Sequence, residues 1–118
     1  MPFICPTITA YSEKEYQTQV GKVAHLASRI QIDLTDGEFT DKATIAADQA
    51  WWPAGLKADF HLMYVNPFDT AKAIIKHRPS LIVVHAESKD NFGHFIAYCH
   101  EHKTKAGIAL MPAVRPTL

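Results

Sequence analysis

IQIDLTDG, at residues 30–37, alternates apolar and polar side chains strictly as far as Thr35. A period of two is typical of a β-strand with two different faces. The apolar members share one face: Ile30, Ile32 and Leu34. The polar members share the other face: Gln31, Asp33 and Thr35. Asp36-Gly37 then predicts a turn. The stretch indicates either a strand end that presents catalytic groups, as in α/β enzymes, or a half-exposed strand whose polar face meets water.

The composition indicates one folded domain. A chain of 118 residues has the length of a single domain, and its 47% hydrophobic content is enough for a buried core. The net charge is zero, so no excess of charge points to nucleic acid or an anionic membrane as a partner. No apolar run approaches the roughly 20 residues of a membrane span.

The cysteines and the N-terminus favour the cytoplasm. Cys5 and Cys99 lie far apart in the sequence and have no zinc-type spacing. The N-terminus lacks the charged-then-apolar pattern of a signal peptide. We therefore expect two reduced thiols in a cytoplasmic protein, without a disulfide framework.

Strand and helix patterns alternate along the chain. Strands are predicted at residues 3–9, 30–35, 58–63, 81–85 and 106–110. Four helices are predicted between them: one capped by Ser12 with Glu15, one at residues 44–52, one from Asn66-Pro67 to His77, and one capped by Ser88. This order predicts parallel βαβ units with right-handed crossovers.

Two α/β architectures fit this order, an open doubly wound sheet and part of a (β/α)8 barrel. No G-x-G-x-x-G follows the first strand, so the dinucleotide-binding form of the open sheet loses support. Each strand also has one apolar face, as with Phe60 and Leu62 opposite Asp59, His61 and Met63. An open sheet with helices on both sides is apolar on both faces, whereas a barrel has helices outside only. The alternation favours a partial TIM barrel, with about five strands and four helices in a single incomplete domain over residues 1–118.

Polar side chains converge where three successive strands end. Gln31 and Asp33 are followed by His61 on the next strand and by His85 on the one after, with Glu87 close behind. Carboxyl ends of barrel strands form the catalytic face, and adjacent strands lie about 4.8 Å apart. These side chains could therefore meet one metal ion. For each histidine, the alternative is hydrogen-bonded packing.

Several motifs run in unbroken order along almost the whole chain: CPTI at residues 5–8, DLTDGEF at 33–39, HLMYVNP at 61–67, VHAE at 84–87 and KAGIAL at 105–110. The combination of D-x-x-D-G-x-F with H-L-M-x-x-N-P is specific, although each part alone would be weak. In these motifs the chain resembles the ribulose-phosphate 3-epimerase family.

The resemblance implies metal-assisted epimerisation at C3 of a pentulose 5-phosphate. One aspartate of the family removes a proton and a second re-protonates the opposite face. A divalent metal, such as zinc, iron or manganese, stabilises the enediolate between the two steps. Asp33 matches the catalytic base and a metal ligand, and His61 matches a metal ligand that also contacts substrate. Thr7 stands at a substrate-binding serine, and Met63 matches a methionine near the reacting carbons.

Two features depart from the family pattern. Gln31 replaces a histidine ligand, and an amide oxygen suits harder ions better than zinc; His85 could substitute for it. A full barrel needs at least about 200 residues and eight strands, so the match implies the N-terminal half, without the phosphate-binding loops or the second aspartate. We therefore expect a chain that self-associates and is weakly active or inactive alone. The alternative is a non-catalytic barrel fragment that binds a metal or a partner.

Overall fold

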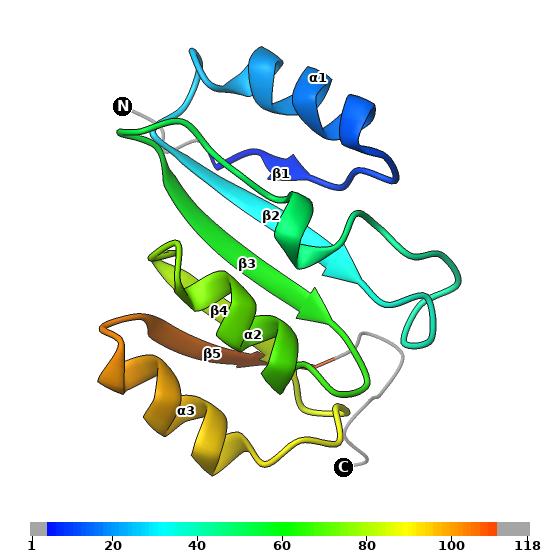
Figure 1. Ribbon diagram of the computed structural model, residues 1–118, viewed down its shortest axis with the longest axis vertical. Coiled ribbons are helices and arrows are strands. Elements are labelled where there is room, and N and C mark those ends of the chain that lie inside the picture. The colour runs from blue at the N-terminus through cyan, green and yellow to red at the C-terminus, as the bar shows by residue number, and fades with distance from the viewer. Residues whose placement is uncertain (1–4, 111–118) are drawn as a thin grey trace, which may run out of the picture.

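The computed structural model describes residues 5–110, which form one parallel five-stranded sheet in the order β1-β2-β3-β4-β5 (Figure 1). The strands are β1 (Thr7–Ile8), β2 (Arg29–Thr35), β3 (Lys57–Met63), β4 (Leu81–His85) and β5 (Lys105–Ala109). The helices are α1 (Glu13–Val23), α2 (Phe68–Ile75) and α3 (Phe92–Glu101), with a single 3-10 turn, η1 (Ala47–Gln49). The sequential strand order confirms the predicted α/β arrangement of a partial TIM barrel.

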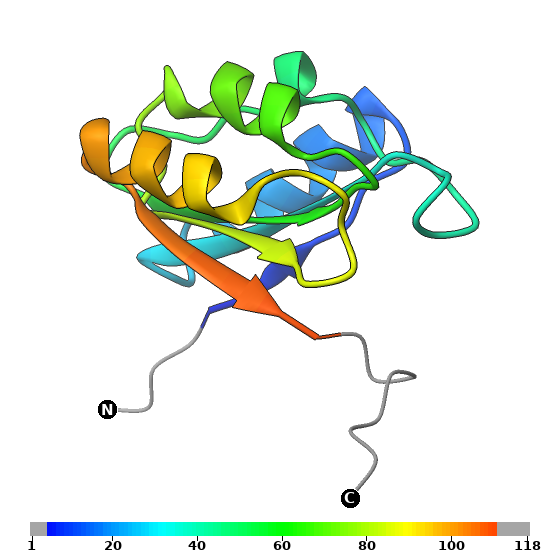
Figure 2. The ribbon, with the colours of Figure 1, turned by 90° about the horizontal axis from the view of Figure 1, so that it is seen from below.

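All helices cover the same side of the sheet, which we call the outer face (Figure 2). The outer-face residues of β2, β3 and β4 are almost completely buried: Ile30, Ile32, Leu34, Phe60, Leu62, Ile82 and Val84. The opposite side, the inner face, is not covered by any helix of residues 5–110 (Figure 2). The periods of the two kinds of element explain this arrangement. Apolar residues recur at every second position of a strand and about every 3.6 positions of a helix, so the apolar face of the sheet packs against the apolar stripes of the helices.

Among the three helices, α1 has the start that the local sequence predicted correctly. Ser12 is the N-cap, and its Oγ accepts a hydrogen bond from the backbone N–H of Glu15 at 3.1 Å. Tyr16 and Val20 then lie one helical turn apart and are each 1% exposed. A capping hydroxyl followed by an apolar stripe is sufficient to define this helix locally.

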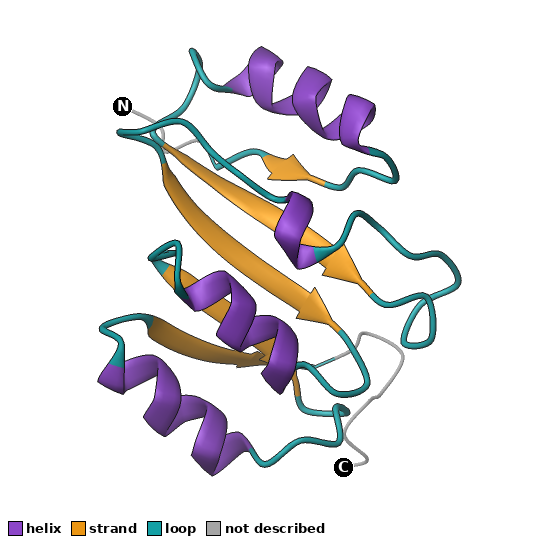
Figure 3. Cartoon of the chain, in the orientation of Figure 1, coloured by secondary structure: helices purple, strands orange, loops and turns teal. Residues whose placement is uncertain are grey.

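The predicted helix at residues 44–52 is wrong, because only η1 forms there. The backbone N–H of Thr44 donates to the carbonyl of Thr35 at 3.3 Å, and that of Ile45 donates to the carbonyl of Ala10 at 3.1 Å. These bonds fix the start of the segment in an extended path beside the strand ends. Figure 3 shows the resulting long loop between β2 and η1.

The predicted caps of the other two helices are also wrong. Asn66 does not cap α2; the backbone N–H of Phe68 instead donates to Oδ2 of Asp90, 22 residues away, at 2.6 Å. Asn91 rather than Ser88 caps α3, accepting from the N–H of His94 at 3.0 Å. At α2 the replacement comes from a loop that is distant in sequence, which short-range patterns do not contain, whereas at α3 the cap lies only three residues after the predicted one.

Strand register brings the inner-face residues into rows. Asp33 lies opposite His61, which lies opposite Val83, which lies opposite Gly107. The predicted strand bounds hold within one residue for β2 to β5, whereas β1 is shorter than predicted, and residues 3–4 lie outside the described range. No helix of the described residues is long and apolar enough to cross a membrane.

Candidate active site on the inner face

Asp33 is the centre of a polar cluster near the carboxyl ends of β2 and β3. Its Oδ1 accepts a hydrogen bond from Nε2 of Gln31 at 3.0 Å, and its Oδ2 accepts from Oγ1 of Thr9 at 3.1 Å. Nδ1 of His61, on the adjacent strand, lies 3.4 Å from Oδ1. The Asp33 side chain is 16% exposed, so it is held firmly and still meets solvent.

The surroundings of Asp33 favour its ionised form. Burial raises the pKa of this carboxyl, but hydrogen bonds from His61, Gln31 and Thr9 outweigh burial and hold the pKa below its ordinary value. Asp33 is therefore a carboxylate at neutral pH. It can accept a proton from a bound molecule on the open side of the sheet.

His61 also contacts a second histidine. Its Nε2 lies 2.7 Å from Nε2 of His85 on β4. The two rings are inclined by only 23° and their centroids are 4.8 Å apart, so the rings meet edge to edge through these nitrogens. A single proton shared between the two nitrogens makes this contact a hydrogen bond.

His85 is the most enclosed member of the cluster. Its side chain is 7% exposed, Phe39 packs on its ring at 5.1 Å between centroids, and Oε1 of Glu87 lies 3.7 Å from its Nδ1. Burial, with a further contribution from the neighbouring His61, lowers the pKa of His85. His85 is therefore neutral at physiological pH.

Four of the predicted site residues form one contiguous group: Gln31, Asp33, His61 and His85. The two remaining ones, Thr7 and Met63, lie on the same sheet, and no hydrogen bond or ion pair is found between either of them and the group within residues 5–110. Thr7 is exposed and pairs with Gln31 in register, and Met63 pairs with Thr35. Sequence reasoning missed Thr9 as a partner of Asp33. Its position two residues after Thr7, on the same face of the first strand, is the signal that could have identified it.

Asp36, the other carboxylate of the DLTDG motif, has a structural role. Its Oδ1 accepts from the backbone N–H groups of Glu38 at 2.8 Å and Phe39 at 2.7 Å, and its Oδ2 accepts from that of Val65 at 2.9 Å. Burial raises its pKa, but these N–H groups outweigh burial and keep the pKa below the ordinary value. Both carboxylate oxygens therefore fasten the loop after β2 to the end of β3.

The cluster offers two well-placed donors for a metal ion. Oδ1 of Asp33 and Nδ1 of His61 are 3.4 Å apart, a spacing that two ligands of one ion, each bound at about 2.0–2.2 Å, can have. His85 approaches the other edge of the His61 ring, and Gln31 turns its amide nitrogen to Asp33. Within residues 5–110, no three His, Cys, Asp or Glu side chains are grouped to hold an ion. A metal held here needs a further ligand.

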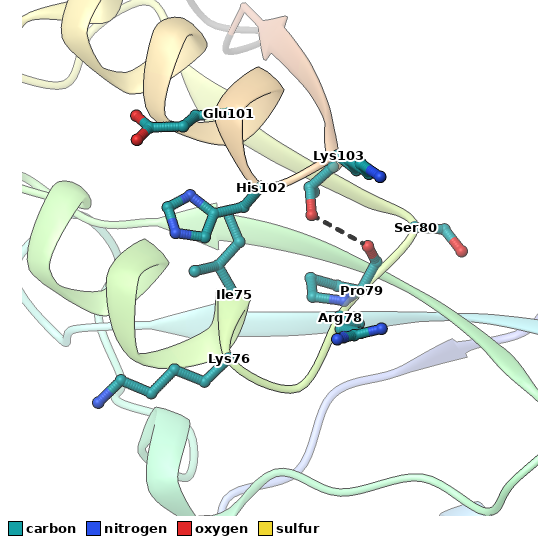
Figure 4. Close-up of a pocket in the computed structure, with 9 residues that line it drawn as sticks. Ile75, Lys76, Arg78, Pro79, Ser80, Glu101, His102 and Lys103 are labelled. Carbon is teal, nitrogen blue, oxygen red and sulfur yellow. Dashed lines mark hydrogen bonds between the residues drawn. The ribbon is translucent and has the colours of Figure 1, made fainter.

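A separate pocket of about 640 Å³ lies at the opposite end of the strands (Figure 4). Lys76, Arg78 and Lys103 line it, and Oγ1 of Thr104 donates to the carbonyl of Pro79 across it at 3.3 Å. These basic residues follow the C-terminal ends of α2 and α3, where cations stabilise a helix. The basic lining thus has a structural explanation, and the pocket is not part of the Asp33 cluster.

A comparison against protein families agrees with the sequence motifs. A model of the ribulose-phosphate 3 epimerase family matches residues 3–117 of this chain. A search of curated proteins finds no match. The family has a TIM-barrel fold, binds sugar phosphates and uses a divalent metal. Because the match covers nearly the whole sequence, this protein belongs to the ribulose-phosphate 3-epimerase family.

Proposed function

We propose that this protein is an isomerase of the epimerase type, acting at C3 of a pentulose 5-phosphate, with Asp33 as the group that removes the proton. One observation supports this most directly. Asp33 is an ionised carboxylate at a strand end on the open inner face, held by Gln31, Thr9 and His61. Such a group is oriented for proton abstraction beside a carbonyl.

The chemistry assigns roles to the neighbours of Asp33. Removing a proton next to a carbonyl leaves negative charge on oxygen, which a positive group must stabilise. A divalent ion such as zinc, iron or manganese, held by Asp33 and His61, would supply that charge when bound, and Gln31 would join them as a ligand once its amide turned to exchange its nitrogen for its oxygen. Thr7 and Met63, on the same sheet, are proposed to contact the sugar.

Epimerisation needs proton transfer on both faces of a planar enediolate. Among residues 5–110, Asp33 serves one face, but both oxygens of Asp36 are occupied by backbone N–H groups and Glu87 is directed at His85. Lack of one positioned acid typically costs about 10²–10⁴-fold in rate. We therefore expect the 118-residue chain on its own to epimerise slowly.

A coupled epimerase assay with added zinc, iron or manganese tests this proposal. Asp33→Asn is compared with the unchanged chain and with Asp69→Asn, which alters an exposed carboxylate on α2. We expect a slow rate that Asp33→Asn lowers by at least about 100-fold and that Asp69→Asn leaves unchanged. Equal rates in the unchanged chain and Asp33→Asn would refute the role of Asp33. Turnover on the order of 10 per second would refute the expected slowness.

A non-catalytic role is the second candidate, because no helix of residues 5–110 covers the inner face and no described strand pairs with the outer edge of β1 or β5. β1 and β5 are the outermost strands, and Ile108 and Leu110 beside this edge are 47% and 62% exposed. Unpaired strand edges and exposed apolar side chains favour association. We expect the chain to self-associate. Light scattering over a dilution series checks this, and a monomer at every concentration would contradict it.

We also propose a cytoplasmic location. Cys5 and Cys99 are both free thiols, and such thiols persist in a reducing compartment. Fractionation of cells that express the tagged chain is the test, and recovery from an extracellular or periplasmic fraction would argue against it.

A further inference from the structure

Thr9 donates one of the hydrogen bonds that orient Asp33, and the backbone of Thr9 is itself held by a side chain. Thr9 directly follows β1, the outermost strand, so within residues 5–110 no strand lies beside it on the side away from β2. Backbone N–H and carbonyl groups that are removed from water need hydrogen-bond partners. At Thr9, which is half-buried, these partners come from a helix instead of a strand.

Gln19 of α1 satisfies both backbone groups of Thr9. Its Oε1 accepts a hydrogen bond from the N–H of Thr9 at 3.3 Å, and its Nε2 donates to the carbonyl oxygen of Thr9 at 3.1 Å. A carboxamide carries an acceptor and a donor side by side, so one glutamine can pair with both groups of a single residue. Figure 1 shows α1 beside β1, which brings Gln19 within reach. Gln17, on the same helix, is exposed.

The pair of bonds from Gln19 acts on Asp33 through the hydroxyl of Thr9. Oγ1 of Thr9 donates to Oδ2 of Asp33 at 3.1 Å, while Oδ1 accepts from Gln31 at 3.0 Å. One bond to each oxygen opposes rotation of the carboxylate about its Cβ–Cγ bond. Threonine is branched at Cβ and has few side-chain rotamers, so the position of Oγ1 follows from the position of the Thr9 backbone.

We propose that Gln19 is a positioning residue for the removal of the proton by Asp33. By holding the backbone of Thr9, it keeps the Thr9 hydroxyl on Oδ2 and the carboxylate in one orientation on the inner face. The effect on catalysis rests on the proposed function, whereas the connection from Gln19 to Thr9 does not. A purely structural glutamine would stabilise the contact of α1 with β1 and leave the reaction unchanged.

NMR of the full chain, with a metal chelator and without substrate, tests the connection. Three-bond couplings report the side-chain rotamer of Thr9, and hydrogen exchange reports the protection of its amide. Gln19→Met keeps a side chain of similar length without either hydrogen bond. We expect one rotamer and a protected amide in the unchanged chain and in the control Gln17→Met, but averaged rotamers and faster exchange in Gln19→Met. A single rotamer with a protected amide in folded Gln19→Met would overturn the proposal.

Exchange of the C3 proton of ribulose 5-phosphate for deuterium, with zinc in deuterium oxide, tests the effect on the reaction. The C3–H electron pair moves towards the carbonyl oxygen as Asp33 takes the proton. A deuteron from the solvent then replaces that proton, and the electron pair returns to form C3–D. Exchange on one face needs no second acid, so this step can be measured where epimerisation is slow.

The variants should separate positioning from substrate binding. Loss of a partner that orients a ligating or reacting group typically costs about 10–100-fold in activity, and we expect kcat for exchange to fall by this factor in Thr9→Val and Gln19→Met while KM stays the same. Thr9→Ser, which keeps the hydroxyl, should lose far less than Thr9→Val. Gln17→Met should match the unchanged chain. An unchanged kcat in folded Gln19→Met, or a change in KM alone, would refute the positioning role.

Failure of the proposed function gives a different result. No exchange by the unchanged chain, or equal exchange by Asp33→Asn, would contradict the role of Asp33 as the base. The NMR measurement uses neither metal nor substrate, so it decides in either case whether Gln19 holds Thr9.

Discussion

The two faces of the sheet are made by the same strands and differ in almost every physical property. Along β2 and β3, the outer face carries Ile32, Leu34 and Phe60, each at most 1% exposed under the helices. The inner face carries Asp33 and His61, which are partly exposed and joined through polar contacts. The outer face supplies hydrophobic burial, whereas the inner face supplies oriented polar groups.

This difference shows that successive residues of one strand can serve different purposes, one stabilising the fold and the next taking part in the chemistry. A residue and its chain neighbour point to opposite sides of a strand, so one can be essential for folding and the next for function. Burial of apolar surface dominates the free energy of folding. Substitutions on the outer face should therefore change stability much more than substitutions on the inner face.

The largest expected effect comes from a matched pair of adjacent valines. Val84 is on the outer face and fully buried, whereas Val83 is on the inner face and partly exposed. Val84→Ala should lower the free energy of unfolding by about 2–3 kcal/mol, because burial is lost and a cavity forms. Val83→Ala should lower it by less than about 1 kcal/mol. Urea denaturation measures both, and equal losses would show that the inner face is buried as deeply as the outer one.

A smaller effect is expected at Asp36, which fastens the loop after β2 to the end of β3. Asp36→Asn should destabilise the fold at neutral pH by about 1–2 kcal/mol, because an amide NH2 cannot accept the N–H of Val65. The folded-state pKa of Asp36 is lowered, so its contribution is present above the unfolded pKa and is lost as pH falls through the folded pKa.

The urea midpoint from neutral pH down to about pH 2 checks this. The unchanged chain should lose stability below about pH 4, near the unfolded carboxyl pKa, and Asp36→Asn should lose less over the same interval. The exposed Asp69→Asn variant serves as the control and should follow the unchanged chain. Parallel curves for Asp36→Asn and the unchanged chain would exclude the anchoring role.

The smallest effect on stability is expected at Asp33 itself. Asp33→Asn should change the free energy of unfolding by no more than about 1 kcal/mol, since the residue remains partly exposed and an amide can still bond Thr9 or Gln31. Thermal and urea unfolding beside the epimerase assay give the comparison. A loss of several kcal/mol would make Asp33 a structural residue and would remove the contrast between the two faces.

Local sequence was sufficient where one short segment decides the structure. Strict alternation at residues 30–35 gave the two faces of β2, and Ser12 gave the start of α1. It failed where distant groups intervene: Ala10 and Thr35 hold residues 44–45 extended, and Asp90 caps α2. Short-range patterns do not contain those partners.

The sequence by itself determined the alternation of strands and helices, the face on which each strand residue lies, and the motifs that place the chain in its family. Only the tertiary structure decided that Thr9 donates to Asp33 and that His61 contacts His85. It also decided that Asp36 accepts a hydrogen bond from the backbone of Val65, at the start of the loop after β3. These contacts join residues 24 to 29 positions apart. They depend on strand register and side-chain direction, which are fixed only when the outer face packs beneath its helices.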